Sequence, residues 1–534
     1  MTRICAAALG GGIIGTVVLV SACGGGGDDT APTVSKEQLC QDVANTAMPD
    51  ATFTAVEHHP SGDFTAPDKS VVKGLPAFCR VAATLKPSAD SNIRVEVWLP
   101  ADNWNGKYLG LGNGGYAGSL DYSSLSRGLA RRYAVAHTDM GTSPATALNG
   151  EVLQGHPEKW IDWGYRSTHL MTVLAKGVSQ KYYSSAPARS YFIGCSTGGG
   201  QGFHEAERYP ADYDGIIAGA PANDRLAAHT SVMSWWSASK GNPASELPPA
   251  KVTLIANAAI AACDAADGVA DAIISRPEKC GFKPQTLQCA GPDAADCLTA
   301  PQAATAAKLY AGVTNTVTGE VYPGLAIGSE PSWSLYTGGA PAGTLPLFGG
   351  LYTWVFGPNF DWRTFDYGAD LVTSQTVLAP MISAISGDLK AFRDRGGRMI
   401  SYHGTADIII SHYRTNEYVQ KIESTTGQSA NFLRYYVVPG MGHCGGGNAP
   451  TVFGGSLQSS PSAGDATRDL LTALEGWVEQ GAAPDRIVAS QYADATLTGA
   501  PARTRPLCPF PQVAKYDGSG DVNKEASFAC VAPD

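Results

Sequence analysis

A serine flanked by glycines, at the point where an apolar run meets a helix-compatible stretch, constrains this chain most. Residues Gly194-Cys195-Ser196-Thr197-Gly198 form the pattern G-x-S-x-G, between the apolar run Ser190–Gly194 and the stretch Gly199–Tyr209. In a nucleophile elbow a strand turns so sharply into a helix that side chains at the two glycine positions would collide. This context predicts a strand–turn–helix unit with Ser196 as a nucleophile. A glycine-rich turn around an ordinary serine is the alternative.

Two later segments carry the groups that would activate the serine. A hydroxyl becomes a good nucleophile only when a base takes its proton. In folds with this elbow, the acid and the histidine follow the serine along the chain, each after a later strand. Asp407 comes after the apolar run Arg398–Tyr402, and His443 lies in a glycine-rich loop after the run Arg434–Val438. We therefore predict Asp407 as the acid and His443 as the base.

Short apolar runs alternate with helical stretches, which is typical of a mainly parallel sheet covered by helices. The predicted strands are Ile93–Leu99, Lys107–Leu111, Ala134–Thr138, Ser190–Gly194, Gly215–Ala218, Arg398–Tyr402 and Arg434–Val438. The predicted helices include Ser167–Lys181, Gly199–Tyr209 and Ala466–Gln480. This rhythm is lost from about residue 223 to residue 387. We predict an α/β-hydrolase core in residues 37–222 and 388–534, with a large inserted lid domain at 223–387. Long surface loops are the alternative for the insertion.

The N-terminus has the features of an export signal. A basic residue, Arg3, precedes the apolar run Ala6–Val20, which is too short to span a membrane as a mature helix. The run ends in Val20-Ser21-Ala22-Cys23, which resembles a bacterial lipobox. We predict a signal peptide over residues 1–22, lipidation of Cys23 and a flexible linker over residues 23–36. The protein would be an outer-membrane lipoprotein, or periplasmic or secreted, in a Gram-negative bacterium; ordinary cleavage after a small residue is the alternative to lipidation.

The cysteine count fits an exported chain. There are twelve cysteines, of which two lie in the targeting segment, so ten remain. An even number in an exported protein predicts five disulfides, whereas zinc would need CxxC or HxxxH spacing, which the sequence lacks. If Ser196 and His443 touch, their neighbours Cys195 and Cys444 must also be close, and a disulfide between them is natural.

These residues resemble the tannase and feruloyl esterase family, whose hallmark is that neighbouring disulfide. The resemblance runs from about Cys40 to the C-terminus and is closest to the mono(2-hydroxyethyl) terephthalate hydrolase branch, with matching stretches at 190–196, 394–397, 402–404 and 502–509. It implies an α/β-hydrolase core, a large lid, a structural calcium and five disulfides. The implied pairs are Cys40–Cys79, Cys195–Cys444, Cys263–Cys280, Cys289–Cys297 and Cys508–Cys530.

Two backbone N–H groups are expected to hold the oxyanion of the reaction intermediate. One belongs to the residue after the nucleophile, Thr197, whose side chain we expect to be immaterial because the backbone donates. The glycine-rich loop Leu111–Tyr116 fits the second donor, and the resemblance places it at Gly115. A glycine-rich turn without chemistry is the alternative for this loop.

An acidic loop is the candidate metal site. Cys263–Ile273 carries three carboxylates within eight positions, a density of hard oxygen ligands that suits calcium, but it lacks the ligand spacing of an EF-hand. From spacing alone, a solvated acidic loop is an equal alternative. The resemblance implies a structural Ca²⁺ and no organic cofactor. Its implied ligands are the side chains of Asp264, Asp267 and Asp271 and the carbonyls of Val269 and Ile273.

The substrate pocket is expected to be apolar. The related terephthalate-monoester hydrolase holds the free carboxylate of its substrate with a lid arginine. The nearest stretch here, Leu345–Trp354, has no arginine, and none occurs between Arg276 and Arg363. We therefore predict a preference for uncharged aromatic esters, unless Arg363 folds back to restore the contact. The residues predicted to line the pocket are His403, Ile410, Trp333, Phe348 and Trp354. Both His403 and His412 lie beside the acid, which disfavours them as the base.

Together these features predict a secreted serine esterase that acts on a small aromatic ester, of the feruloyl or gallate type, through an acyl-enzyme. Mono(2-hydroxyethyl) terephthalate hydrolysis is the alternative within the family, and a peptidase would share the triad. An inactive surface lipoprotein used for binding is the alternative of another class. The net charge of −10 argues against a nucleic-acid partner. Membrane contact is expected only through Cys23, and the sequence predicts no oligomeric state.

Overall fold

Nine strands form the central sheet, which is parallel over most of its width. The computed structural model describes residues 34–533 apart from 338–349, 457 and 495. All neighbours from β7 to β13 run parallel, whereas β1, β4 and β5 form an antiparallel end that joins β7. In sheet order the strands are β1 Ala51–His59, β4 Phe78–Leu85, β5 Ile93–Pro100, β7 Ala134–Thr138, β6 Lys107–Leu111, β8 Arg189–Cys195, β9 Gly215–Gly219, β12 Arg398–Gly404 and β13 Leu433–Val438. The predicted α/β fold with a mainly parallel sheet is confirmed.

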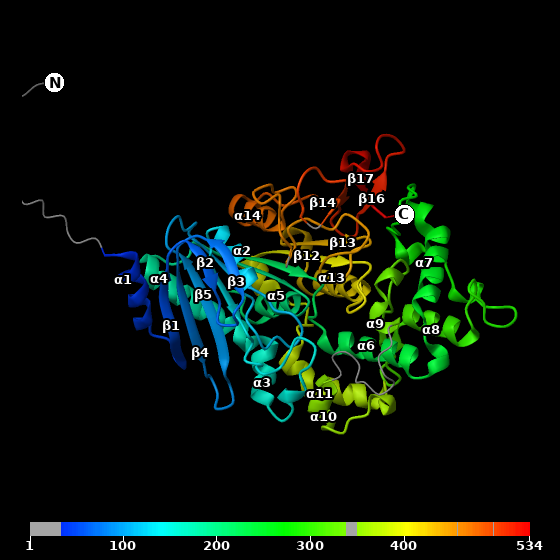
Figure 1. Ribbon diagram of the computed structural model, residues 1–534, viewed down its shortest axis with the longest axis horizontal. Helices are drawn as coiled ribbons and strands as arrows, with labels where there is room; N and C mark the ends of the chain where they lie inside the picture. Colours follow the sequence, from blue (N-terminus) through cyan, green and yellow to red (C-terminus); the bar gives the residue numbers. More distant parts are fainter. Residues whose placement is uncertain (1–33, 338–349, 457, 495, 534) are drawn as a thin grey trace, which may run out of the picture. The chain divides into compact units, whose positions relative to one another are not determined.

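Helices cover both faces of this sheet because successive strand residues point to opposite sides. On β7, Ala134 and Ala136 belong to one apolar core, and Val135 belongs to the other. Helices α4 and α5 pack on the first face, and α2 and α14 on the second (Figure 1). The helices of the sheet domain are α1 Lys36–Asp42, α2 Tyr122–Ala130, α3 Pro157–Ile161, α4 Ser167–Tyr183, α5 Thr197–Arg208, α12 Lys390–Asp394, α13 His412–Thr426 and α14 Leu470–Gln480.

Most of the segment between β9 and β12, up to α12, is an insertion, since these two strands are neighbours in the sheet. It is mostly helical, and its helices lie together in the green part of Figure 1. These helices are α6 Arg225–Lys240, α7 Pro249–Cys263, α8 Ala300–Ala311, α9 Ser334–Thr337, α10 Gly350–Phe356 and α11 Ala369–Ile382. The described residues from Lys36 onward cluster as one unit, so the insertion packs onto the sheet domain instead of standing apart.

Four small two-stranded sheets lie outside the central sheet. They are β2 Gly62–Thr65 with β3 Val71–Leu75, β10 Val313–Thr314 with β11 Val321–Tyr322, β14 Ile487–Gln491 with β15 Arg503–Leu507, and β16 Val513–Tyr516 with β17 Phe528–Val531. None of the helices in the described ranges is long and apolar enough to cross a membrane. The predicted signal, the Cys23 anchor and most of the linker lie outside the described residues.

Five disulfides are present, and each has the pairing that the family resemblance implied. They are Cys40–Cys79, Cys195–Cys444, Cys263–Cys280, Cys289–Cys297 and Cys508–Cys530. The Cys195–Cys444 bond spans 249 positions and joins the end of β8 to the loop after β13. It therefore links the chain on either side of the insertion.

Candidate active site

Ser196 stands at a sharp turn between β8 and α5. Its backbone has φ 63° and ψ −120°, a combination that side chains rarely adopt. Glycines make room for the turn: a Cβ at Gly194 would lie 2.5 Å from the backbone of Gly198, and one at Gly112 would lie 2.6 Å from Gly198 Cα. This is the geometry of a nucleophile elbow, with the hydroxyl carried at the carboxyl edge of the sheet.

The carboxyl ends of three strands meet at this edge. In the parallel register Cys195 of β8 lies opposite Gly219 of β9, and Tyr402 of β12 lies opposite both Gly219 and Tyr436 of β13. The loops that follow β8, β12 and β13 carry Ser196, Asp407 and His443 respectively, so the sheet brings the three predicted residues to one edge.

Asp407 and His443 form a short hydrogen bond. His443 Nδ1 lies 2.7 Å from Asp407 Oδ2, and the other carboxylate oxygen accepts the backbone N–H groups of Ile409 and Ile410 at 2.8 and 3.0 Å. His403 Nε2 lies 3.1 Å from the same Oδ2, so two imidazoles share one oxygen. Among the described residues Ser196 Oγ makes no hydrogen bond, and the contact that would join it to His443 is one that often tightens only around a substrate.

Burial alone would raise the pKa of Asp407, but its surroundings reverse this. The side chain is fully buried, yet the His443 charge and the hydrogen bonds from His403 and His443 hold the pKa of this carboxyl well below its usual range. Asp407 is therefore an ionised carboxylate at neutral pH, and it orients His443 through Nδ1.

Gly115 and Thr197 lie together beside Ser196. Thr197 Oγ1 donates to Gly115 O at 2.8 Å, and Gly198 N donates to Asn113 O at 2.7 Å, so the glycine-rich loop is bound to the start of α5. The backbone N–H groups of Gly115 and Thr197 have no hydrogen-bond partner within the described part of the chain. Two such groups at one cavity can hold an oxyanion. The Thr197 side chain, expected to be immaterial, is the link between the two donor residues.

Ser196 lines a small cavity. Its walls, within the described ranges, are Gly115, Ser196, Thr197, Ala222, Arg225, Ala228, His229, Val232, Ile409 and Ile410. Ile410 was predicted to line the pocket and does so. Arg225 was not predicted, because the arginine of the related hydrolase corresponds to a later stretch of the lid, Leu345–Trp354. The pocket therefore holds a guanidinium, and the prediction of an apolar pocket is wrong in this respect.

Three predicted pocket residues lie elsewhere. Trp333 is fully buried and donates its indole N–H to Ser329 Oγ at 2.9 Å, and Trp354 stacks on Trp160 with ring centroids 5.3 Å apart. Trp333 belongs to the core of the insertion itself, whereas Trp354 packs the insertion against the sheet domain. His403 is fully buried behind Asp407, where it positions the acid.

Phe348 and Arg363 were also named in the prediction of the substrate pocket. Phe348 lies outside the described residues. Arg363, which could have folded back, pairs with Asp361 at 2.9 Å and is half exposed, so it does not reach the cavity.

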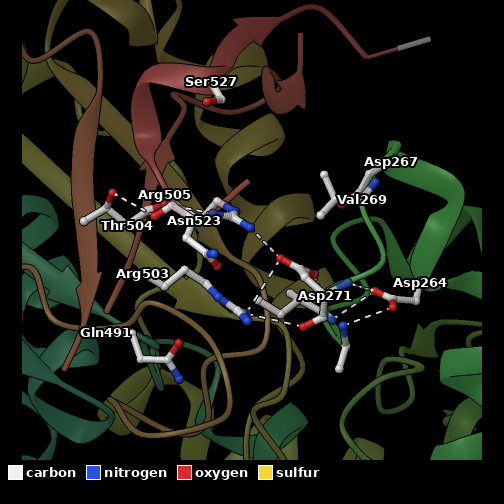
Figure 2. Close-up of polar contacts among 12 residues, drawn as sticks. Asp264, Asp267, Val269, Asp271, Gln491, Arg503, Thr504, Arg505, Asn523 and Ser527 are labelled. Atoms are coloured by element: carbon white, nitrogen blue, oxygen red, sulfur yellow. Dashed lines mark hydrogen bonds and ion pairs between the residues drawn. The ribbon is translucent and has the colours of Figure 1, made fainter. Parts of the chain in front are cut away.

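The acidic loop after α7 is drawn together by its own carboxylates (Figure 2). Asp264 Oδ1 accepts the N–H groups of Asp271 and Ile273 at 3.3 and 3.1 Å, so the loop folds around this side chain. Asp267 Oδ1 accepts the N–H of Val269 at 3.0 Å. The loop thus presents three carboxylates and several carbonyls within a few residues, an all-oxygen donor set of the kind that calcium takes.

Arginine side chains neutralise only part of the negative charge of this loop. Arg505 of β15 pairs with Asp271 Oδ2 at 2.5 Å, and Arg503 donates to the carbonyl of Asp271 at 3.3 Å (Figure 2). Burial raises the pKa of Asp267, and the nearby charges of Asp271 and Asp264 raise it further, although hydrogen bonds from Ser275 and Val269 oppose the shift. A cation would relieve this repulsion, and the oxygen donors are of the type that calcium takes. The three carboxylates do not converge on one point within the described residues, and Arg505 competes for Asp271.

Known proteins were compared with the chain as a whole. A family model described as tannase and feruloyl esterase matches residues 79–344 and 347–531. An esterase of Xanthomonas campestris pv. campestris, described as uncharacterised, is 37% identical, with 93% of this chain and 92% of that protein aligned. A mono(2-hydroxyethyl) terephthalate hydrolase of Piscinibacter sakaiensis is 33% identical, with 88% of this chain and 87% of that protein aligned.

Solved structures give the same result. The crystal structure of feruloyl esterase B from Aspergillus oryzae superposes with a TM-score of 0.86 at 27% identity, and the match covers 93% of this chain and 100% of that one. The family model matches most of the chain and the relatives align over nearly their full length. The chain therefore belongs to the tannase and feruloyl esterase family and is a carboxylic ester hydrolase with the α/β-hydrolase fold.

Proposed function

We propose that the protein is a secreted serine esterase that cleaves esters of aromatic acids through an acyl-enzyme. Ser196 is the nucleophile, His443 is the base and Asp407 orients the imidazole. The observation that carries this proposal is the 2.7 Å hydrogen bond between His443 Nδ1 and Asp407 Oδ2. The loops that hold these two residues begin at the edge of the sheet where the Ser196 elbow stands. This bond leaves His443 Nε2 as the nitrogen that takes the serine proton.

The reaction follows from these positions. Ser196 Oγ attacks the ester carbonyl as its proton passes to His443 Nε2, and the N–H groups of Gly115 and Thr197 receive the oxyanion. His443 then gives the proton to the leaving alcohol, and the acyl group stays on Ser196. Water, activated by the same imidazole, releases the acid and restores the serine. The ionised carboxylate of Asp407 stabilises the imidazolium in both steps.

The choice of aromatic acids rests on the family. The relatives are named for feruloyl and terephthalate esters, both of which are esters of aromatic acids. We propose methyl ferulate and methyl gallate as first substrates.

Activity on p-nitrophenyl acetate and methyl ferulate tests the proposal. Ser196→Ala, His443→Ala and Asp407→Asn should each lower kcat by several orders of magnitude, and double variants should lose little more, because the triad acts as a unit. Ser185→Ala, at an exposed serine, is the matched control and should keep full activity. Mass spectrometry of a quenched reaction should find the acyl group on the peptide that contains Ser196. Full turnover in His443→Ala would overturn the assignment.

We also propose a structural calcium ion in the acidic loop, held by the side chains of Asp264, Asp267 and Asp271 and the carbonyls of Val269 and Ile273. When bound, the ion would neutralise the carboxylates and fix the loop that follows α7, which contacts β15 through Arg505. The loop lies apart from the cavity in front of Ser196, so the role is structural.

Export and anchoring complete the proposal. The five disulfides support an oxidising compartment, because such bonds persist outside the reducing cytosol. We propose cleavage before Cys23 and lipidation of its thiol. The mass of the N-terminal peptide tests this: a diacylglyceryl adduct on Cys23 is expected, and an unmodified N-terminus at another residue would contradict it.

A further inference from the structure

Arg225 is a buried cation at the wall of the active-site cavity. It is the first residue of α6, only 1% of its surface is exposed, and it lines the same cavity as Ser196 and Thr197. Cations are unfavourable at the N-terminal end of a helix, where the backbone dipole is already positive. The position of this guanidinium is therefore electrostatically unfavourable unless another group compensates for its charge.

Its protein contacts use only part of its hydrogen-bonding capacity. Nη1 donates to Thr197 Oγ1 at 3.0 Å, and the guanidinium carbon lies 3.8 Å from the centre of the Trp163 ring, so one face and one nitrogen are fixed. Nε and Nη2 are buried and have no hydrogen-bond partner among the described residues. These two nitrogens share one edge of the planar group, and that edge pairs with both oxygens of a carboxylate.

No carboxylate of the described chain neutralises this charge. The adjacent acid, Asp224, caps α6 through one oxygen, and its other oxygen accepts from Arg414 at 2.7 Å. Arg225 forms no ion pair with any described residue, whereas Arg414 pairs with three acids, Asp224, Glu320 and Glu417. A buried charge without a partner is costly, so an anion that enters with a ligand would gain more here than at an exposed arginine.

We propose that Arg225 is the binding site for a free carboxylate on the acyl part of the substrate, which makes monoesters of aromatic dicarboxylic acids the preferred substrate class. The inference rests on the proposed function, because it needs Ser196 to attack an ester in the cavity that Arg225 lines. Nε and Nη2 donate side by side to the two carboxylate oxygens, and the bond to Thr197 and the stack on Trp163 hold the fork in place. The specificity arises from α6 and not from the later lid stretch Leu345–Trp354, which has no arginine.

Two matched esters test the selectivity. One is 4-(methoxycarbonyl)benzoate, and the other is methyl 4-carbamoylbenzoate, its neutral amide counterpart of similar shape. The protein should favour the carboxylate in kcat/KM by about ten- to a hundredfold, as expected for one charge-assisted pair. Arg225→Gln should abolish this ratio, and Arg225→Lys should keep part of it, because lysine retains the charge without the fork. Arg363→Gln, an equal charge change at a half-exposed arginine, is the control and should leave the ratio unchanged.

A binding measurement separates this proposal from the esterase assignment. In the Ser196→Ala protein, calorimetry with 4-(methoxycarbonyl)benzoate should show binding that weakens about ten- to a hundredfold when Arg225→Gln is added, with no need for turnover. If this binding appears but no ester is cleaved by the wild type, the proposed function fails and the carboxylate site stands. If the wild type cleaves esters but does not favour the carboxylate over the amide, the carboxylate site is overturned. The same holds if the preference survives in Arg225→Gln. The wild-type comparison needs no variant, so it decides the matter even if Arg225→Gln does not fold.

Discussion

Gly115 has a backbone position that no other residue type can easily take. Its φ is +54°, and a Cβ would lie 1.8 Å from the carbonyl oxygen of Ala147. A side chain here would force Gly115 and Ala147 apart, and Gly115 carries one of the two proposed oxyanion donors. The close approach of this backbone to its neighbours is therefore a requirement of the site and not a property of a loose turn.

Gly115→Ala should lower kcat for p-nitrophenyl acetate by roughly a hundred- to a thousandfold, the effect of losing one oxyanion donor. The matched control is Gly114→Ala, because a Cβ at the neighbouring glycine meets nothing within 4 Å. Steady-state kinetics of both variants makes the comparison. Equal activity of the two would show that Gly115 does not supply the donor.

The catalytic residues that belong to a local sequence pattern could be predicted. The residues that line the pocket could not. Ser196, Asp407 and His443 each follow a strand in a fixed chain order, so their meeting at one edge follows from the fold. Arg225 has no such mark in the sequence: it is one cation in a helix that carries few charges, and only packing brings it to Thr197. Trp333 was wrongly predicted to line the pocket. An aromatic residue in an insertion most often belongs to the core of that insertion, as Trp333 does.

The disulfide between Cys195 and Cys444 joins the element that carries the nucleophile to the loop that carries the base. Replacing both cysteines with alanine should lower the free energy of unfolding by about 5 kcal/mol, from the loop entropy of a crosslink across 249 positions. It should also lower activity, since the elbow and the His443 loop lose their covalent link. Urea unfolding and kinetics measure the two effects.

The Cys289–Cys297 bond is the matched control for this change. It closes a span of only 8 positions within the insertion, for which the same relation gives about 2.5 kcal/mol. Its removal should leave turnover unchanged. Loss of activity in this control equal to that in the Cys195–Cys444 variant would mean that the effect is not specific to the catalytic loops.

Removal of the proposed calcium ion should destabilise the acidic loop that follows α7. A chelator should lower the melting temperature by a few degrees, because an ion that binds only the folded state stabilises it in proportion to the logarithm of its concentration. Asp267→Asn should lower the melting temperature in the same way and abolish the chelator effect. Asp296→Asn, at an exposed acid elsewhere in the insertion, should do neither. An unchanged melting curve in excess chelator, with no metal by elemental analysis, would contradict the site.

Among the elements, the buried parallel strands could be predicted from short apolar runs, and their bounds agree within two residues. In the antiparallel end β5 was predicted, but β1 and β4 were missed. The strand β1 alternates between exposed and half-buried positions and ends in polar residues. In β4 the apolar run is broken by Arg80, which is buried in the sheet only because Glu96 on β5 pairs with it at 2.5 Å. A buried ion pair across two strands leaves no signal in either strand alone.

The protein as a whole should lose stability as the pH falls below neutrality. Burial, with the charges of Arg208 and Arg225, lowers the pKa of His204 from 6.5 to about 3, and burial with His403 lowers the pKa of His412 to about 3. The unfolded chain therefore takes up protons near pH 6.5 that the folded chain refuses. The stability from both histidines is complete above pH 6.5 and declines from there toward pH 3, by up to about 1.4 kcal/mol per pH unit for each.

Urea midpoints at pH 7 and pH 5 measure this loss. His204→Gln should make the difference between the two midpoints smaller, because the glutamine cannot take up the proton in either state. His156→Gln is the control, since this histidine is exposed and pairs with Asp90 at the surface. The idea is wrong if the midpoint of the His204→Gln protein falls as steeply as that of the wild type.

The position of the insertion in the chain also determines when the catalytic residues become available during synthesis. The elbow belongs to the part of the sheet that is synthesised early, whereas β12 and β13, with the proposed acid and base, are made only after the entire inserted segment. Until then β9 is the outer strand on that side, and Ser196 has no base. A nascent chain that has not reached His443 has the proposed nucleophile but lacks the proposed base. The proposed reaction therefore cannot begin until the chain beyond the insertion, with β12 and β13, has been made.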